Sequence, residues 1–366
     1  MFDSKDERFM KLAISLAKKG GAKTKSNPLV GAVIVKGGQI VAKGYHEVYG
    51  GAHAELQALR AAGLENLGGA TMYVSLEPCC HFGKTPPCSE AIIKSGIARV
   101  VVASFDPNPI VAGKGVAKLK QAGIAVDVGL LDEQQRQMNE KYWYYMENKM
   151  PFVTMKAAMT LDGKIATKDG NSKWISSEKS RRFTRRMRGE HQGIMVGVNT
   201  VIADNPRLTT RIKGEANPLK IVVDPKLKLP LNSTVVENAG IEELTVFTSK
   251  YADSGRRAKL EKAGAKIIEL EEKDGRLDLR SGLKKLAESG IASILLEGGG
   301  SLNFEMLKSN LVQKCVFVVA PKIFGGKYAK TAVEGSGISE IADAVKLGDL
   351  NVKRIGGDIF IVGYIK

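Results

Sequence analysis

The sequence predicts an α/β protein with two domains, residues 1–148 and 149–366. Segments rich in β-branched residues alternate with amphipathic segments along nearly the whole chain, which is typical of sheets covered by helices. A length of 366 residues also exceeds what one hydrophobic core usually organises. Met150-Pro151 interrupts a helical pattern, because a residue before proline is pushed out of the helical region. We therefore place the domain boundary immediately ahead of this dipeptide.

The first domain is expected to be a sheet layered with helices. Its opening helix has an Asp3/Ser4 cap, apolar residues at three- and four-residue spacing, and an end near Gly20-Gly21. Gly37-Gly38 separates two short strands, as a hairpin requires. In chain order, the predicted strands are 30–35, 40–45, 71–76, 100–103 and 125–128, and the predicted helices are 53–62, 88–95, 115–122 and a segment ending at 142–148.

The second domain continues the alternation and adds a glycine-rich turn. The predicted strands are 152–158, 193–198, 220–223, 244–248, 266–269, 293–297, 315–320 and 358–365, and the predicted helices are 177–189, 254–263 and 280–289. Gly298-Gly299-Gly300 then turns the chain from a strand into a short helix. Such a turn commonly binds a phosphate-bearing ligand in open α/β sheets, because helix N-terminal N–H groups point at it. No G-x-G-x-x-G motif precedes a helix, so a Rossmann fingerprint is absent.

Three residues of the first domain form a candidate zinc site. His53 lies at a predicted helix start, and Cys79 and Cys88 flank the loop that opens another helix. Imidazole and thiolate are preferred zinc ligands, and a catalytic zinc site keeps its fourth position for water. Glu55 lies two residues after His53, where its carboxylate can approach that position without being a ligand. The pattern predicts hydrolytic deamination by a metal-activated water, with Glu55 carrying a proton to the leaving amine.

Two other interpretations of this motif stay open. His81 or Cys80 could supply a fourth protein ligand, which would make the zinc structural. Cys79 and Cys88 could also be ordinary buried cysteines, with His53 as a helix cap. The combination of H-x-E with a strand, Pro-Cys and a helix favours the catalytic site, because neither half of the motif is specific alone.

The residues around the motif resemble a known family. Ser75-Leu-Glu-Pro-Cys-Cys-His-Phe-Gly-Lys-Thr-Pro-Pro-Cys88, together with His53-Ala-Glu55, is similar to the deaminase domain of the bifunctional riboflavin-biosynthesis deaminase/reductases, which has a cytidine-deaminase-like fold. The resemblance implies zinc-dependent deamination of 2,5-diamino-6-(5-phosphoribosylamino)pyrimidin-4(3H)-one. It also implies substrate contacts from Asn27, His46, His81 and Lys84. An amide and two imidazoles can read a pyrimidine edge, and a lysine can meet a phosphate.

The second domain extends the resemblance to nearly the whole chain, from Asp6 to about Tyr364. Segments 156–166, 174–177, 197–211 and 296–302 are similar to the reductase domain of the same family, which has a dihydrofolate-reductase-like fold. The resemblance implies NADPH as hydride donor, and reduction of the ribosyl group of 5-amino-6-(5-phosphoribosylamino)uracil to ribityl.

The resemblance also assigns residues of the second domain to two groups. On the substrate side it places Ser172, Arg188, Leu208, Arg211 and Glu297. On the cofactor side it places Ala158, Trp174, Thr200, Asp204, Gly299, Gly300, Ser301, Leu302 and Asn303. Lys156 and Asp204 are candidates for proton transfer. Asp224-Pro225 departs from the pattern, because relatives offer the cofactor a hydroxyl there and proline has none.

Charge and composition leave two rival classes of function. The net charge is +16, of which +4 falls in residues 1–148 and +12 in residues 149–366. This excess would suit a nucleic-acid-editing deaminase, but the chain is only 6% aromatic and has no basic stripe interleaved with aromatics for stacking bases. The seven bases between 173 and 188 fit a solvated helix face as well as an anion site. The second rival is a non-catalytic, zinc-stabilised binding protein.

The sequence predicts a cytoplasmic protein. The first 20 residues lack a charged region followed by an apolar one, and no run approaches 18 apolar residues. Four cysteines in a chain of this length suit a reducing compartment. We therefore expect a cytoplasmic enzyme that uses Zn2+ and NADPH on small phosphorylated pyrimidines, without nucleic-acid or membrane partners. The oligomeric state stays open, a homo-oligomer included.

Overall fold

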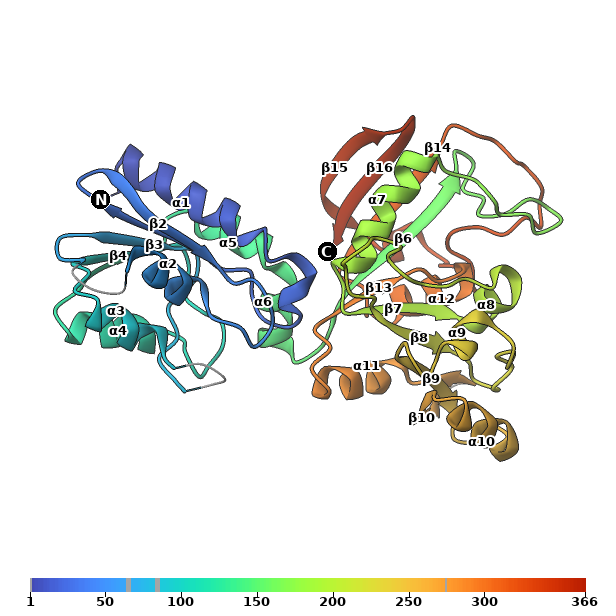
Figure 1. The fold of residues 1–366 in the computed structure, drawn as a ribbon. Coiled ribbons are helices and arrows are strands. Elements are labelled where there is room, and N and C mark those ends of the chain that lie inside the picture. The colour runs from blue at the N-terminus through green and yellow to red at the C-terminus, as the bar shows by residue number, and fades with distance from the viewer. Residues whose placement is uncertain (1, 64–66, 83–85, 274) are drawn as a thin grey trace. The chain divides into compact units, whose positions relative to one another are not determined.

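The computed structural model describes residues 2–63, 67–82, 86–273 and 275–366. Over these ranges the chain forms two compact units, Met1–Lys149 and Met150–Lys366. The division falls one residue after the predicted one. Figure 1 shows a sheet flanked by helices in each unit. None of the helices in the described ranges is long and apolar enough to cross a membrane.

In the first unit, the described residues form a five-stranded sheet in the order β2-β1-β3-β4-β5. β1 pairs antiparallel with β2 and β3, whereas β3, β4 and β5 run parallel. The strands are β1 Gly31–Lys36, β2 Gln39–Tyr45, β3 Thr71–Val74, β4 Arg99–Val102 and β5 Ala125–Val128. The helices are α1 Ser4–Ala17, α2 Ala54–Ala62, α3 Cys88–Lys94, α4 Lys114–Gln121, α5 Asp132–Met138 and α6 Glu140–Asn148, with a 3-10 turn at Gly21–Thr24.

Local sequence signals set several of these boundaries. Asp3 caps α1, because its side chain accepts from the Asp6 backbone N–H while the Asp6 carboxylate accepts from the Asp3 N–H. His53 is the residue before α2, and Gly63 ends that helix with a φ of 93°. One face of the sheet packs on α2, α3 and α4, and the other packs on α1. α2 and α3 are thus neighbours, and His53 and Cys88 lie at their N-terminal ends.

In the second unit, the described residues form a nine-stranded sheet in the order β10-β9-β8-β7-β13-β6-β14-β16-β15. The strands from β10 to β14 in this order run parallel, and β16 and β15 are added antiparallel. The strands are β6 Phe152–Thr160, β7 Gly193–Gly197, β8 Leu219–Val223, β9 Leu244–Ser249, β10 Lys266–Leu270, β13 Ser293–Leu296, β14 Lys314–Ala320, β15 Leu347–Ile355 and β16 Asp358–Ile365, with a separate hairpin of β11 Glu272–Lys273 and β12 Arg276–Leu277.

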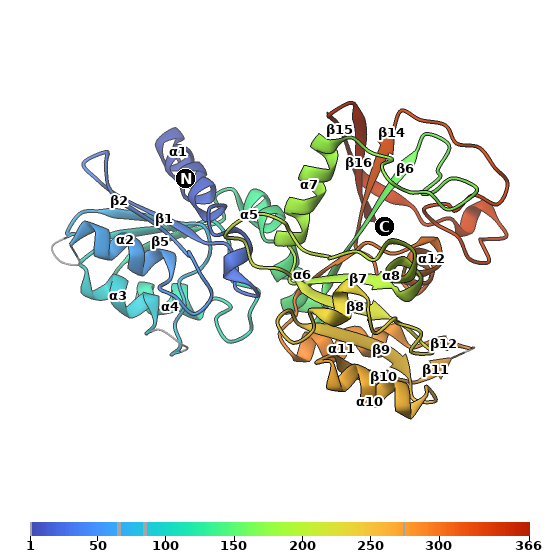
Figure 2. The ribbon, with the colours of Figure 1, turned by 45° about the vertical axis from the view of Figure 1, so that its right-hand side comes forward.

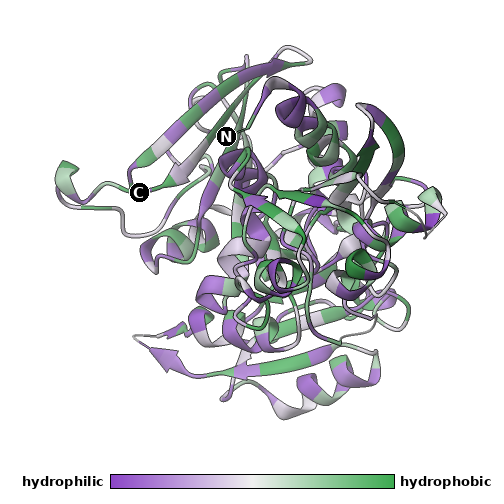
Figure 3. Cartoon of the chain, turned by 90° about the vertical axis from the view of Figure 1, so that its left-hand side faces the viewer, coloured by the Kyte–Doolittle hydropathy of each residue, from purple (hydrophilic) through white to green (hydrophobic). Residues whose placement is uncertain are grey.

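Helices cover both faces of this sheet. They are α7 Glu178–Gly189, α8 Val198–Asp204, α9 Thr234–Glu237, α10 Ser254–Lys262, α11 Leu279–Glu288 and α12 Gly300–Lys308, with a 3-10 turn at Ile341–Asp343. α11 and α12 pack on one apolar face, and α8, α9 and α10 pack on the other. Figure 3 shows long hydrophobic stretches along the strands, whereas the helices alternate between hydrophobic and hydrophilic turns. The β13–β6 register pairs Leu296 with Met155, which brings Glu297 beside Lys156.

Some elements differ from the sequence prediction. β15 was not predicted, because most of its residues are exposed and no apolar alternation marks it. The strand predicted to end at Val198 ends at Gly197, and α8 begins directly after it. Val198 and Val201 are buried and three residues apart, which fits the repeat of a helix. A segment of only seven residues, rich in β-branched side chains, is too short to reveal this repeat in the sequence.

Candidate active sites

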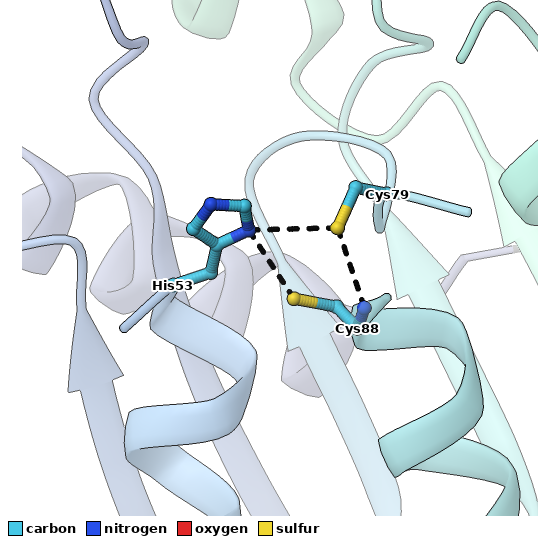
Figure 4. A group of neighbouring side chains, drawn as sticks. All are labelled: His53, Cys79 and Cys88. Atoms are coloured by element: carbon cyan, nitrogen blue, oxygen red, sulfur yellow. Dashed lines mark hydrogen bonds between the residues drawn. The ribbon is translucent and has the colours of Figure 1, made fainter. Parts of the chain in front are cut away.

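His53, Cys79 and Cys88 converge in the first unit (Figure 4). His53 precedes α2, Cys79 lies in the loop after β3, and Cys88 is the first residue of α3. The His53 Nδ1 lies 3.5 Å from the Cys79 Sγ and 3.3 Å from the Cys88 Sγ. The three potential ligand atoms all lie within 4.8 Å of one another. The fold therefore gathers the three residues that the motif predicted as metal ligands.

The spacing and chemistry of this cluster fit a zinc ion. Zinc ligands at about 2.1 Å for nitrogen and about 2.3 Å for sulfur lie about 3.6 Å apart at a tetrahedral angle. The observed nitrogen–sulfur separations of 3.5 and 3.3 Å are close to this value. Two thiols and an imidazole are also donors that zinc prefers. Cys80 does not join the cluster, since its Sγ lies 4.0 Å from the Ile110 carbonyl oxygen.

Hydrogen bonds and charges link the pKa of Cys79 to the pKa values of His53 and Cys88. A hydrogen bond from Cys88, assisted by His53, lowers the pKa of Cys79 to about 4 against the effect of burial. The Cys79 thiolate in turn raises the pKa of His53 to about 9. It also raises the pKa of Cys88 above its usual range, and burial adds to that effect. The cluster thus concentrates negative charge on sulfur and holds protons that a divalent cation can displace.

Glu55 lies beside the cluster in the first turn of α2, and it is 3% exposed. Burial raises the pKa of Glu55 to about 7, because the ionised carboxylate loses its hydration. The charge of Cys79 adds to this effect, whereas His53 and Cys88 oppose it. A carboxyl group with a pKa near neutrality can both accept and return a proton at working pH.

Two predicted substrate residues, Asn27 and His46, lie next to His53. The His46 and His53 rings meet edge to face with centroids 5.5 Å apart, and the His46 Nε2 lies 3.1 Å from the Asn27 Nδ2. The His46 Nδ1 lies 3.1 Å from the Ala52 carbonyl oxygen. Because an amide NH2 only donates and a carbonyl only accepts, His46 carries its proton on Nδ1 and accepts at Nε2. Burial lowers the pKa of His46, which keeps the ring neutral.

The other two predicted substrate residues belong to the loop between Cys79 and α3. His81 is half-buried, and its Nδ1 is buried with no hydrogen-bond partner among the described residues. A buried polar atom of this kind is suited to meet a ligand, because leaving it unpaired costs free energy. Lys84 lies outside the described residues.

Glu77, which the sequence did not single out, anchors the loop that carries Cys79. Glu77 is 4% exposed, and its carboxylate accepts hydrogen bonds from the Gly113 and Val116 backbone N–H groups at 2.9 and 3.0 Å. A Cβ added to Gly115 would lie 2.0 Å from the carbonyl oxygen of the residue after Glu77. The carboxylate therefore joins the start of α4 to the loop that carries Cys79. Its partners are 36 and 39 residues away, so no local sequence signal marks this role.

The second unit contains a charged cavity of about 470 Å³, which we call the substrate cavity. Arg188 from α7 binds Glu297 with two hydrogen bonds of 2.9 Å, from Nε to Oε1 and from Nη2 to Oε2. The Lys156 Nζ lies 3.8 Å from the same carboxylate. Burial alone would raise the pKa of Glu297, but Arg188 and Lys156 hold it at about 2. The carboxylate is therefore ionised at neutral pH and fixes the orientation of Arg188.

The substrate cavity brings together residues of both predicted groups. The predicted substrate residues that line it are Ser172, Arg188, Leu208, Arg211 and Glu297. The predicted cofactor residues that line it are Ala158, Trp174, Thr200, Asp204 and Gly299. Ala158 and Trp174, which were predicted on the cofactor side, thus line this cavity and not the second cavity described below.

Further arginines line the same cavity. Arg181 and Arg185 of α7 and Arg207 do so, although the sequence prediction did not name them. Burial lowers the pKa of Arg211, and the nearby positive charges of other arginines add to that effect. Such crowding of like charges favours an anionic ligand. The basic run at 173–188 was the available signal, and the structure places part of it on the cavity wall.

A second cavity of about 810 Å³, which we call the cofactor cavity, adjoins the first. Residues that line both cavities are Ile165, Ser172, Thr200, Asp204 and Gly299. The start of α12 contributes Gly300, Ser301 and Leu302. The volume suits a large organic ligand, and the N-terminal N–H groups of α12 suit its phosphates.

Gly300 and Asn303 of the predicted cofactor turn have packing and hydrogen-bonding roles within the protein. A Cβ on Gly300 would lie 2.4 Å from the Glu334 side chain, so only glycine fits there without a shift. Asn303 is fully buried and does not line the cavity, and its Nδ2 donates to the carbonyl oxygens of Gly298 and Ala332. Asn303 therefore holds the shape of the turn.

Two family profiles match the chain. The profile described as "RibD C-terminal domain" matches residues 151–361, and the one described as "Cytidine and deoxycytidylate deaminase zinc-binding region" matches residues 3–104. The chain is 47% identical over 356 residues to the riboflavin biosynthesis protein RibD of Actinobacillus pleuropneumoniae, covering 97% of this chain and 94% of that protein. It is 36% identical over 367 residues to RibD of Escherichia coli (strain K12), covering 97% and 98%.

Solved structures give the same result. Acinetobacter baumannii RibD, form 1, superposes with a TM-score of 0.89 at 34% identity, covering 99% of both chains. The Thermotoga maritima structure described as a diaminohydroxyphosphoribosylaminopyrimidine deaminase/5-amino-6-(5-phosphoribosylamino)uracil reductase superposes with a TM-score of 0.87 at 38% identity, also covering 99% of both. The predicted fold class, a cytidine-deaminase-like domain followed by a reductase domain, is confirmed.

Proposed function

Because this chain belongs to the RibD family of riboflavin biosynthesis proteins, we propose that its two units catalyse two consecutive reactions. The chain is an enzyme with a zinc-dependent deaminase domain and an NADPH-dependent reductase domain. The proposed substrates are the two phosphorylated pyrimidines in the name of the Thermotoga maritima relative. The observation that carries this proposal is the buried Glu55 beside the cluster of His53, Cys79 and Cys88.

In the first unit, His53, Cys79 and Cys88 would hold the zinc ion, which supplies a Lewis acid that lowers the pKa of water. Glu55 takes a proton from the attacking water and gives it to the departing nitrogen, so that ammonia leaves. Burial raises its pKa from the ordinary carboxyl value, which favours taking up the proton before it is passed on. Asn27 and the neutral His46 hold each other next to His53, and we assign them to contact with the pyrimidine ring.

In the second unit, the cofactor cavity would hold NADPH, which supplies the hydride. Opening the ribose to an imine places a proton on the ring oxygen, before the former anomeric carbon is reduced. We assign that proton to Lys156, because Glu297 stays ionised at a pKa of about 2 and Arg188 is bound to Glu297. Asp204, which lines both cavities, is the second candidate.

The phosphate of the substrate needs positive charge in the same cavity. Arg181, Arg185, Arg207 and Arg211 line it and supply that charge. A guanidinium group matches a phosphate with two parallel hydrogen bonds. Their clustering supports a small phosphorylated substrate for this unit.

Ammonia release and NADPH oxidation test the two halves separately. Wild-type protein should release ammonia from the diaminopyrimidine phosphate and then oxidise NADPH. The Glu55→Gln protein should keep zinc and release ammonia about 10²–10⁴-fold more slowly, yet oxidise NADPH when the deaminated intermediate is supplied. Undiminished ammonia release by zinc-loaded Glu55→Gln protein would contradict the role of Glu55. Tight retention of tRNA or single-stranded DNA at physiological salt would support the nucleic-acid rival instead.

A further inference from the structure

The cofactor cavity has two distinguishable ends along the sheet. The residues that it shares with the substrate cavity lie near β6, β13 and β7. Residues that line only the cofactor cavity include Val223 and Pro225 at the end of β8, and Arg276 and Leu277 of β12. Because β8, β9 and β10 follow β7 in the sheet, this second group lies further from the substrate cavity. Figure 2 shows the β11–β12 hairpin beyond the ends of β9 and β10.

The proposed position of the substrate in the first cavity sets the expected direction of NADPH in the second. Hydride transfer requires the nicotinamide ring to touch the substrate, so the ring belongs at the shared end. The adenosine lies at the other end of the dinucleotide. It therefore falls beside the wall that β8 and the β11–β12 hairpin provide.

Arg276 is the cation at the adenosine end. Among the described residues that line the cofactor cavity, Arg276 and Lys330 are the ones that carry positive charge. The Ile165 backbone N–H donates to the Lys330 carbonyl oxygen at 2.8 Å, and Ile165 lines both cavities. The Lys330 backbone is therefore tied to the substrate end, and its Nζ lies 3.9 Å from the Glu334 Oε1. Arg276 lies on β12, at the other end.

Arg276 is held by an ion pair that it can leave. Its Nη1 bonds to the Oε2 of Glu305 on α12, and the two side chains are 44% and 22% exposed. A pair that is partly open to solvent contributes little to stability, so exchange for another anion costs little free energy. The planar guanidinium also presents paired N–H donors that match a phosphate.

We propose that Arg276 recognises the 2′-phosphate of NADPH and thereby selects NADPH over NADH, with Glu305 as its partner when no coenzyme is bound. This inference rests on the proposed NADPH site. The two coenzymes differ only by that phosphate on the adenosine ribose. A carboxylate near a ribose 2′-OH favours NADH, because it accepts a hydrogen bond from the hydroxyl and repels the phosphate. Arg276 has the opposite charge and attracts the phosphate. Glu305 holds Arg276 at the cavity, and its own negative charge limits how tightly NADPH binds.

Coenzyme binding to the full chain, measured by nicotinamide fluorescence without pyrimidine substrate, tests the proposal. Arg276→Gln should raise the Kd of NADPH roughly tenfold or more and change the Kd of NADH less than about twofold, since one charge-assisted phosphate contact is lost. Glu305→Gln should lower the Kd of NADPH, because it frees Arg276 and removes a negative charge. Lys330→Gln is the matched control, and it should change the Kd values of NADPH and NADH by the same factor.

A second probe isolates the adenosine end. 2′,5′-ADP should displace NADPH more weakly from Arg276→Gln than from the wild type, whereas 5′-ADP should show no difference. Arg276→Lys should lie between the two, because it keeps the charge and loses the paired donors. Equal weakening of both coenzymes, or no change, in Arg276→Gln would overturn the role of Arg276. Failure of the wild type to bind either coenzyme would instead reject the proposed cofactor site, and the inference with it.

Discussion

The two candidate active sites differ in how their charges are balanced. In the first unit, the ligand atoms of His53, Cys79 and Cys88 lie within 4.8 Å of one another, and Cys79 shifts the pKa of both His53 and Cys88. In the second unit, Arg188 and Glu297 already form a two-bond ion pair, and further arginines surround it. The first site is therefore suited to bind a cation. In the second site the Arg188–Glu297 pair is already neutral, and the further arginines leave an excess of positive charge that can bind an anion.

Glu55→Gln should produce the largest difference between the activities of the two sites. Deamination should fall by about 10²–10⁴-fold, because a positioned proton carrier is removed. Zinc content should stay unchanged, and so should NADPH oxidation with the deaminated substrate, since Glu55 belongs to the first unit. The measurement is both rates on one protein sample with its zinc content. A parallel loss of both activities would break the separation into two sites.

Arg188→Gln is the corresponding change in the second unit. It leaves Glu297 with Lys156 as its remaining close cation, 3.8 Å away. Removing one partner of a buried ion pair costs about 3–5 kcal/mol, because the other charge stays desolvated. Urea unfolding should show that loss in the transition of the second unit, together with loss of NADPH oxidation. Zinc content and ammonia release should not change, and a fall in either would contradict the account.

Glu77→Gln should weaken zinc binding without touching a ligand. The two carboxylate oxygens accept from the Gly113 and Val116 N–H groups, whereas a glutamine amide accepts only at its one oxygen, so one of these N–H groups would lose its partner. Loss of such support around metal ligands typically costs 10–100-fold in metal affinity. Competition with a zinc chelator measures the change. Glu90→Gln on α3 is the control, because Glu90 forms a half-exposed pair with Lys118 and should leave zinc affinity unaltered.

Acid titration gives a smaller effect that distinguishes the two units. Glu297 has a pKa lowered from 4.5 to about 2, so its ionised form stabilises the folded state at pH values above 4.5. That stabilisation is lost as the pH falls from 4.5 towards 2, by at most about 1.4 kcal/mol per pH unit. Glu297→Gln should therefore flatten the pH dependence of unfolding of the second unit in this range. An unchanged slope would mean that Glu297 has an ordinary pKa.

The zinc cluster could be predicted from the sequence because its information is local. His53 and Glu55 share one helix start, and Cys79 and Cys88 lie at the two ends of one loop. Their residue types already specify the chemistry. The helix signals at Asp3 and Gly63 were local in the same way, and the structure confirms both boundaries.

The parts that the sequence did not predict depend on distant segments. Arg181 and Arg185 reach the substrate cavity only because the fold sets α7 beside β13 and β6. Glu77 acts on N–H groups that are 36 and 39 residues away. β15 carries no apolar alternation, so its place at the sheet edge follows from pairing with β16 alone. Predicting such features requires the order of the strands in the sheet, and the spacing of apolar residues along the chain does not reveal that order.

X-ray absorption at the zinc edge of the isolated full chain tests the central claim most directly. We predict a zinc ion with two sulfur ligands and one imidazole nitrogen, and a light atom completing the coordination. Glu55→Gln should leave this protein ligand set unchanged, whereas Cys88→Ser should remove one sulfur or lose the metal. Three sulfur ligands, which would bring in Cys80, or a second imidazole would show a closed structural site and contradict the account.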